Sequence, residues 1–172
     1  MPNWYEGGFP DRELVVMDLL KPFLDLVDVL DADGDPVLDG ATPRRPYVCT
    51  VLPNDYSDRL PVVRVFRAGG AADADIKVDP AMVQVAVVAD SREDSWKLLE
   101  YCRQMLLSFH DGGTVTRTDG SKTLIDTVSE MVGPAQFAEL NPEKRFTQLN
   151  FRVTCRKPRG GPDYQKIRES LT

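Results

Sequence analysis

The stretch VQVAVVADSREDSWKLLEYCRQML, residues 83–106, decides the fold because it places a strand directly before a long amphipathic helix. Apolar residues alternate over 83–87, and a period of two predicts a strand. Ser91, followed three residues later by Asp94, resembles a capping box. Beyond it the helical spacing predicts a helix to about Ser108 that packs one face on a sheet, through Leu98, Leu99, Cys102, Met105, Leu106 and Phe109.

The last predicted strand, over residues 145–156, shows the cleanest alternation in the chain. One face carries Thr147, Leu149, Phe151, Val153 and Cys155, and the other carries Gln148, Asn150, Arg152 and Thr154. This pattern indicates an antiparallel sheet with one buried and one polar face. We expect the polar face to be solvated or covered by a neighbouring subunit.

The remaining elements follow from turn signals and short apolar runs. Asp11 can cap a first helix, which Pro22 should kink or end, so the prediction stops at Leu20. Residues 31–46 are polar and rich in turn formers, which predicts a loop. Further strands are predicted over 47–52, 60–66, 82–89 and 124–132, with a turn at Asp119-Gly120 that could form the tip of a hairpin within 114–122.

The order helix, three strands, helix, two strands predicts an α+β fold. Its expected form is a mainly antiparallel sheet of four to five strands with two helices packed on one face. A chain of 172 residues fits one domain. We therefore predict an N-terminal arm over 1–10, a single α+β domain over 11–156 and a flexible C-terminal tail over 157–172.

Composition excludes several classes of protein. The apolar share of 42% supports a packed core. With 27 acidic against 21 basic residues the net charge is -6, which argues against a protein that coats nucleic acid. It does not exclude a channel wall past which DNA moves without binding, because an acidic wall repels phosphate. No segment has the pattern of a signal peptide or a membrane span, so no membrane partner is expected. Cys49, Cys102 and Cys155 lie in apolar patterns and predict buried free thiols, as in a reducing cytosol.

His110 is the only histidine and follows the long helix. It could act as a general base or metal ligand. We favour an imidazole placed at the negative end of the helix dipole, since no second histidine can complete a histidine metal site.

Two further patterns resemble ligand-binding motifs but lack features that those motifs require. Asp31, Asp33 and Asp35 start like a calcium loop, but Pro36 and Thr42 stand where glycine and glutamate are needed. A solvated acidic loop is favoured, with weak divalent binding as the alternative.

The run GSKT over 120–123 resembles a phosphate loop that a serine interrupts, and it precedes a strand instead of a helix. We interpret it as a hairpin turn and predict no catalytic residue, metal ligand or cofactor. An enzyme with acidic metal ligands scattered in the sequence remains an alternative.

Interface candidates come from residue types that subunit contacts favour. Arginine, tryptophan and tyrosine are enriched in interfaces. The candidates are Trp4, Tyr5, Arg64, Arg67, Arg152, Arg156 and Tyr164. Ordinary solvated charge and loose termini are the alternative interpretation.

Four segments carry a family resemblance: Phe9-Pro10-Asp11 before the first helix, LPVVRVFRAGG (60–70), the stretch 83–106, and FTQLNFRVTCRKP (146–158). Together they resemble tail terminator proteins of long-tailed bacteriophages, especially those of actinobacterial phages. The resemblance covers about residues 9–158 and rests on pattern and order, without a chemical motif. It does not include the acidic loop 31–40 or the tail 159–172.

The resemblance implies a structural virion protein of the tail or neck, assembled in the host cytoplasm, without enzymatic activity. Such proteins form a hexameric ring that caps the head-proximal end of the tail tube, ends tube polymerisation and joins the tail to the head connector. The expected partners are other copies of the chain, the tail tube protein, the head–tail connector or neck protein and the tape measure protein, while DNA passes through the lumen without specific binding. Another phage neck or head-completion protein and a cellular adaptor domain are the alternatives.

Overall fold

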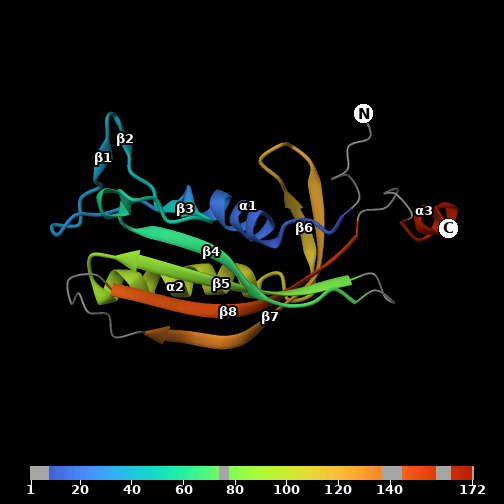
Figure 1. Ribbon diagram of the computed structural model, residues 1–172. Coiled ribbons are helices and arrows are strands. Elements are labelled where there is room, and N and C mark those ends of the chain that lie inside the picture. Colours follow the sequence, from blue (N-terminus) through green and yellow to red (C-terminus); the bar gives the residue numbers. More distant parts are fainter. Residues whose placement is uncertain (1–7, 74–77, 137–144, 158–163, 172) are drawn as a thin grey trace.

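The computed structural model describes residues 8–73, 78–136, 145–157 and 164–171. A curled sheet forms its body, with helices α1 and α2 packed against it and a small hairpin, β1–β2, projecting at one end (Figure 1). The elements in chain order are α1 (Arg12–Leu24), β1 (Leu38–Asp39), β2 (Thr42–Pro43), β3 (Tyr47–Cys49), the 3-10 helix η1 (Tyr56–Arg59), β4 (Val62–Gly69), β5 (Val78–Ala89), α2 (Arg92–Leu107), β6 (Gly113–Thr116), β7 (Lys122–Gln136), β8 (Arg145–Arg156) and α3 (Tyr164–Ser170).

The main sheet has six strands in the order β3-β4-β5-β8-β7-β6, which corrects the prediction of four to five. It is also mixed, because β3 pairs with β4 in parallel while the other pairs are antiparallel. Parallel neighbours need a long crossover, and the connection over 50–61, which contains η1, supplies it. The α+β class itself is as predicted.

The inner face of the sheet forms the core with both long helices. Val83 and Val85 of β5 lie beside Phe151 and Leu149 of β8 in register, and all four side chains are fully buried. Residues from α1 and α2 belong to the same cluster, so both helices pack against this face. Burying each such side chain contributes roughly 1.5–3 kcal/mol, so this layer dominates the stability of the fold.

The predicted helix starts are confirmed. The Asp11 side chain accepts a hydrogen bond of 2.9 Å from the backbone N–H of Glu13, and Ser91 caps α2 by accepting one of 3.0 Å from Asp94. The predicted end of α1 was wrong, because the helix continues through Pro22 to Leu24. Leu24 is buried in the core, and this burial offsets the hydrogen bond that proline cannot donate.

The predicted hairpin forms between β6 and β7 and stands beside α1 (Figure 1). Gly120 in its turn has a φ of 82°, a conformation that glycine adopts readily. At its tip the Arg117 Nε lies 2.6 Å from a carboxylate oxygen of Asp18 in α1, and the Thr118 hydroxyl donates to the other oxygen at 2.6 Å. Burial by itself raises the pKa of Asp18, but these hydrogen bonds outweigh it and hold the pKa below its ordinary value.

Strand β5 starts earlier than predicted and includes Pro80. A proline is tolerated there because β4 pairs with β5 only as far as Met82, so the missing Pro80 N–H faces no neighbouring strand on that side. The turn after β4 packs tightly on this segment. Gly70 has a φ of 101°, and a Cβ on it would lie 2.4 Å from the Pro80 carbonyl oxygen.

The polar stretch 31–46, predicted as a loop, contains the β1–β2 hairpin. The C-terminal stretch contains α3, which the sequence pattern did not indicate, and the side chains of residues 166–170 are exposed. The division into an arm over 1–10, a domain over 11–156 and a flexible tail over 157–172 stays a prediction, and most of that arm lies outside the described residues.

Candidate subunit interface

Two surfaces of the chain have the character of an interface: the open outer face of the sheet and a projecting arm. The outer face follows from the strand register. Phe66, Gln84, Asn150 and Val132 lie side by side across β4, β5, β8 and β7. The neighbouring row joins Met82, Arg152 and Ser129. We call these residues, together with Arg64, the open face.

At one end, the outer face of the sheet is covered by other residues of the same chain. Leu60, Val62, Val88 and Cys49 form a second small cluster, and Leu52, Tyr56 and Phe146 pack against it. The connection between β3 and β4 therefore covers this end. Phe66 and Val132 on the open face remain 40% and 50% exposed, which is high for large apolar residues.

The open face carries positive charge. The Arg64 guanidinium lies 5.0 Å from the ring centre of Phe66, and its Nε donates to the Thr50 carbonyl at 3.4 Å. Arg152 is exposed and forms no hydrogen bond or ion pair with another described residue. Because no carboxylate stands at the open-face positions, this surface is cationic and partly apolar in a chain whose net charge is -6.

The other predicted arginines have partners within the chain. Arg67 forms two hydrogen bonds with the Asp79 carboxylate, at 3.0 and 3.1 Å. Arg156 pairs with Asp126 at 2.8 Å, although its own side chain is largely exposed. Both arginines therefore have structural roles, which limits what they can offer to a partner.

The aromatic candidates lie at the ends of the chain. Trp4 and Tyr5 lie outside the described residues. Tyr164 begins α3, and its side chain lies outside what the structure describes. Their role in an interface stays a prediction.

Asp79 also holds Arg12, a buried residue that sequence reasoning did not single out. The Arg12 Nη2 donates to the carbonyl oxygens of Asp79 and Cys155, at 3.3 and 3.2 Å, and so joins α1 to β5 and β8. Burial is the largest influence on the pKa of Arg12 and lowers it, while Cys155 and Asp79 raise it. Charged residues in the first turn of a helix are usually exposed to solvent. The sequence around Arg12 therefore gives no sign that its side chain is buried.

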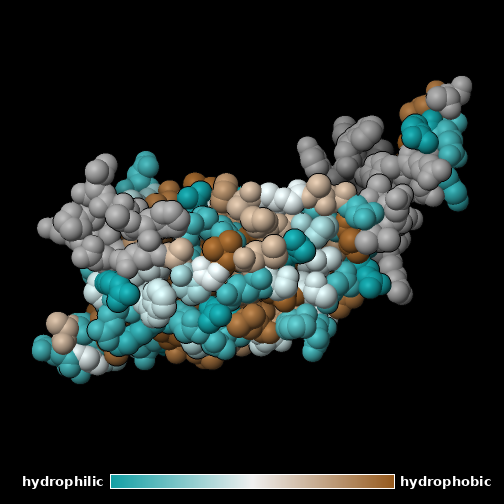
Figure 2. All heavy atoms as spheres, turned by 90° about the horizontal axis from the view of Figure 1, so that it is seen from below, coloured by the Kyte–Doolittle hydropathy of each residue, from teal (hydrophilic) through white to brown (hydrophobic). Residues whose placement is uncertain are grey.

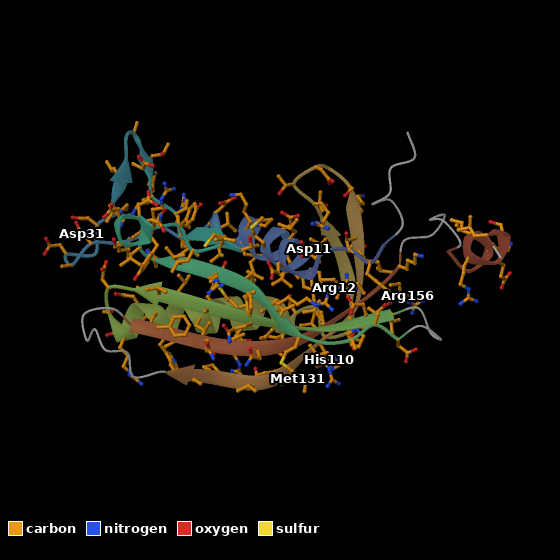
Figure 3. The ribbon with its side chains drawn as sticks, viewed as in Figure 1. Asp11, Arg12, Asp31, His110, Met131 and Arg156 are labelled. Atoms are coloured by element: carbon orange, nitrogen blue, oxygen red, sulfur yellow. The ribbon has the colours of Figure 1, made fainter. Side chains whose placement is uncertain are left out.

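The second surface is a projection formed by residues 26–44, which we call the arm. It is distinct from the predicted N-terminal segment 1–10. Three backbone hydrogen bonds order it: Val29 N–H to Arg44 O at 3.0 Å, Val37 N–H to Val29 O at 2.8 Å and Arg44 N–H to Val37 O at 2.7 Å. It projects from the end of the molecule with β1 and β2 standing away from the sheet (Figure 1). Figure 3 shows Asp31 at the tip of a loop at this end, far from Arg156.

The arm exposes large apolar side chains that do not pack on its own core. Leu26, Leu30 and Leu38 are 75%, 56% and 61% exposed. Scattered exposed leucines are common, but three on one ordered projection indicate a contact surface. Leucines within an Asp- and Gly-rich stretch were the sequence signal that could have found it. An open groove of about 820 Å³ lies beside the arm, and its walls hold both acidic and basic residues, including the ion pairs Lys21–Asp25 and Arg59–Asp55.

The acidic tip of the arm does not have the geometry of a metal site. Asp31 Oδ1 accepts hydrogen bonds of 3.0 Å from the backbone N–H groups of Asp33 and Asp35. Within the parts of the chain that the structure describes, no three or more His, Cys, Asp or Glu side chains gather to hold a metal ion.

The other candidate chemical groups lie in positions that suit structural roles. His110 is exposed in the turn after α2, with its Nδ1 3.2 Å from a carboxylate oxygen of Asp111 (Figure 3). The three cysteines are buried free thiols, as predicted. Burial raises the pKa of Cys102 to about 12 and that of Cys155 to about 11, so both stay protonated near neutrality and are poor nucleophiles.

Seen from below, the molecule shows hydrophobic side chains in separate places among hydrophilic ones (Figure 2). None of the described helices has both the length and the apolar character needed to cross a membrane.

A family model described as phage tail termination protein matches residues 8–162. The match takes in the arm, the open face and the Arg12–Asp79 contact. A search of curated proteins found no match to the chain.

Proposed function

The chain belongs to the phage tail termination protein family and is a structural component of the phage tail, and we propose that it forms a hexameric ring at the head-proximal end of the tail tube. The ring ends polymerisation of the tube protein of a long-tailed phage and provides the surface that joins the tail to the head connector. Assembly takes place in the host cytoplasm before the protein enters the virion.

The observation that carries this proposal is the presence of two different exposed surfaces on one chain, the arm and the open face. A contact between unlike surfaces leaves one of each free on the pair, so it can repeat around an axis and close a ring. A self-complementary surface would instead stop at a dimer. Two such surfaces therefore favour a cyclic assembly.

The charge of the chain fits the passage of DNA. A net charge of -6 disfavours binding of phosphate to most of the surface. A lumen lined by such a chain lets DNA pass without holding it. The cationic open face is then better placed in a subunit contact than toward the lumen.

The partners follow from the position of the ring. One rim binds the tube protein, the other binds the head–tail connector, and the tape measure protein lies within reach at the end of the tube. Of the predicted interface residues, Arg152 is exposed and Arg64 is half-buried on the open face. Arg67 and Arg156 contribute the outer parts of side chains that also pair within the chain. Trp4, Tyr5 and Tyr164 complete the proposed set.

The test is a polymerisation assay with purified tube protein. Adding the full chain is expected to shorten the tubes and to place six-fold rings at one end, as seen by negative-stain electron microscopy. Tubes of unchanged length with bare ends would overturn the proposal. Binding to connector without binding to tube protein would instead identify a neck protein.

A further inference from the structure

We propose that the arm of one subunit docks on the open face of an adjacent copy, and that this contact repeats around the ring. The inference rests on the proposed function, because it specifies how the subunits of the ring join. It commits to a second copy of this chain as the occupant of the open face.

The apolar parts of the two surfaces complement each other. Leu30 and Leu38 are exposed on the arm, and Phe66 and Val132 are exposed on the open face. Contact between the two groups would remove apolar area from water on both sides. Phe66 is of the aromatic type that is enriched at the core of interfaces, so it is placed at the centre of this contact.

The charges on the two surfaces have opposite signs. The arm carries Asp31, Asp33, Asp35 and Asp39, all exposed, and the open face carries Arg64 and Arg152. Exposed ion pairs add little affinity on their own. They favour the correct encounter and fix the register of the docked arm.

The same charges disfavour the symmetric alternatives. Two arms in contact would place acidic tips against each other, and two open faces would place Arg152 near Arg152. Like charges brought together in a contact oppose that mode of association. The head-to-tail contact between unlike surfaces is the arrangement that avoids both repulsions, and it is the one that can close a ring.

The arm is also ordered before it docks. Its backbone hydrogen bonds and the turn around Asp31 hold Leu30 and Leu38 on a preformed projection. Little conformational entropy is then lost on docking, which favours association.

Cysteine cross-linking between full-length chains tests the contact. One preparation carries Leu38→Cys and another carries Phe66→Cys, and a third carries Val132→Cys. They are mixed under ring-forming conditions, with tube protein present, and treated with a short cysteine-specific bismaleimide. The native cysteines are buried, so the unmodified chain serves as the background control.

The expected result is a covalent dimer between the Leu38→Cys chain and either face variant, with little product from any variant alone. A double variant, Leu38→Cys with Phe66→Cys, is expected to give a ladder that ends at the ring size. Rings without these products would overturn the inference and leave the proposed function standing. Arm–arm products, or Phe66→Cys linked to tube protein, would also overturn it. Absence of both rings and products would count against the ring itself.

Charge exchange gives an independent readout that a damaged fold would not reproduce. Arg152→Glu is expected to raise the protein concentration needed for half assembly about tenfold. Adding Asp33→Lys and Asp35→Lys to the same chain is expected to restore assembly. The matched control is Lys97→Glu, an exposed charge reversal on α2, which should leave assembly unchanged. Equal effects of Arg152→Glu and Lys97→Glu, or failure of the exchanged charges to restore assembly, would contradict the contact.

Discussion

The guanidinium of Arg12 lies 3.3 Å from the carboxylate of Asp79, and the two side chains are only 0% and 2% exposed. This buried pair joins the start of α1 to β5. Arg67 of β4 forms a second ion pair with the same Asp79 carboxylate. Buried ion pairs are costly to desolvate, and their stability depends on every partner being present.

Asp79→Ala is therefore expected to destabilise the fold by about 3–5 kcal/mol, because it leaves Arg12 buried without its carboxylate. Urea denaturation measures the change. Replacing both partners, as in Arg12→Met with Asp79→Leu, should cost less than the single change. Asp33→Ala in the exposed arm is the control, with an expected change within about 0.5 kcal/mol. A loss for Asp79→Ala no larger than the control would show that the pair is not coupled.

The hairpin contact predicts a pH dependence. The pKa of Asp18 in the folded chain lies below its ordinary value, because hydrogen bonds from Thr118 and Arg117 outweigh burial. The unfolded chain thus binds the proton more readily, and the stability from this group is present above its unfolded pKa of about 3.9 and is lost as pH falls through the folded pKa.

Asp18→Asn is therefore expected to lower the free energy of unfolding by about 1–3 kcal/mol at pH 7. This difference from the unmodified chain should become smaller below about pH 4. Urea midpoints at several pH values give this comparison. A gap that stays constant with pH would contradict the assignment.

Two phenylalanines on opposite faces of the sheet should behave differently. Phe151 is fully buried, and Phe151→Ala is expected to cost about 3–5 kcal/mol of stability. Phe66 is exposed on the open face, and Phe66→Ala should change the melting temperature little while weakening ring assembly. Thermal denaturation together with sedimentation separates the two effects. Similar losses of stability would show that the open face is not a free surface.

Two glycines with similar backbone angles form a matched pair. Gly112 and Gly120 have φ values of 84° and 82°. A Cβ on Gly112 would lie 2.6 Å from the carbonyl oxygens of Asp126 and Ile125, whereas a Cβ on Gly120 meets nothing within 4 Å. Gly120→Ala should cost about 1–2 kcal/mol for the left-handed backbone alone, and Gly112→Ala clearly more. Equal urea midpoints would contradict the close approach of the α2–β6 turn to β7.

The buried thiols predict slow labelling. Because burial raises the pKa of Cys102 to about 12 and that of Cys155 to about 11, neither forms much thiolate at pH 8. A thiol-specific chromogenic reagent is expected to react slowly with the folded chain and rapidly with all three cysteines in denaturant. Fast reaction of the native protein would show that the core opens readily.

The sequence predicted those elements that depend on interactions between residues close together in the chain. The alternation over 145–156 predicted β8 with the bounds that the structure shows, because the two faces of that strand meet a core and an open surface. Asp11 and Ser91 marked the helix starts, since a cap acts within one turn. The hairpin turn at Gly120 followed from the same kind of local rule.

Other features depended on contacts between distant parts of the chain. The parallel pairing of β3 with β4 depends on where the connection over 50–61 packs, and the continuation of α1 past Pro22 depends on burial of Leu24 in the core. The strands of the arm are too short for their own propensity to predict them. The open face could be expected as a polar face, but the row that brings Phe66 beside Asn150 and Val132 exists only in the sheet register.

By itself the sequence determined the α+β class, the helix caps, the last strand and the family resemblance, because each follows from residue spacing along a few turns or one strand. Only the tertiary structure decided that Arg12 is buried and meets Asp79, which is 67 positions away. It also decided that Arg67 pairs with Asp79, while Arg152 has no such partner among the residues that the structure describes. The physical reason is that the fate of a charged side chain depends on which groups fold against it, and its own neighbours in sequence do not specify those groups.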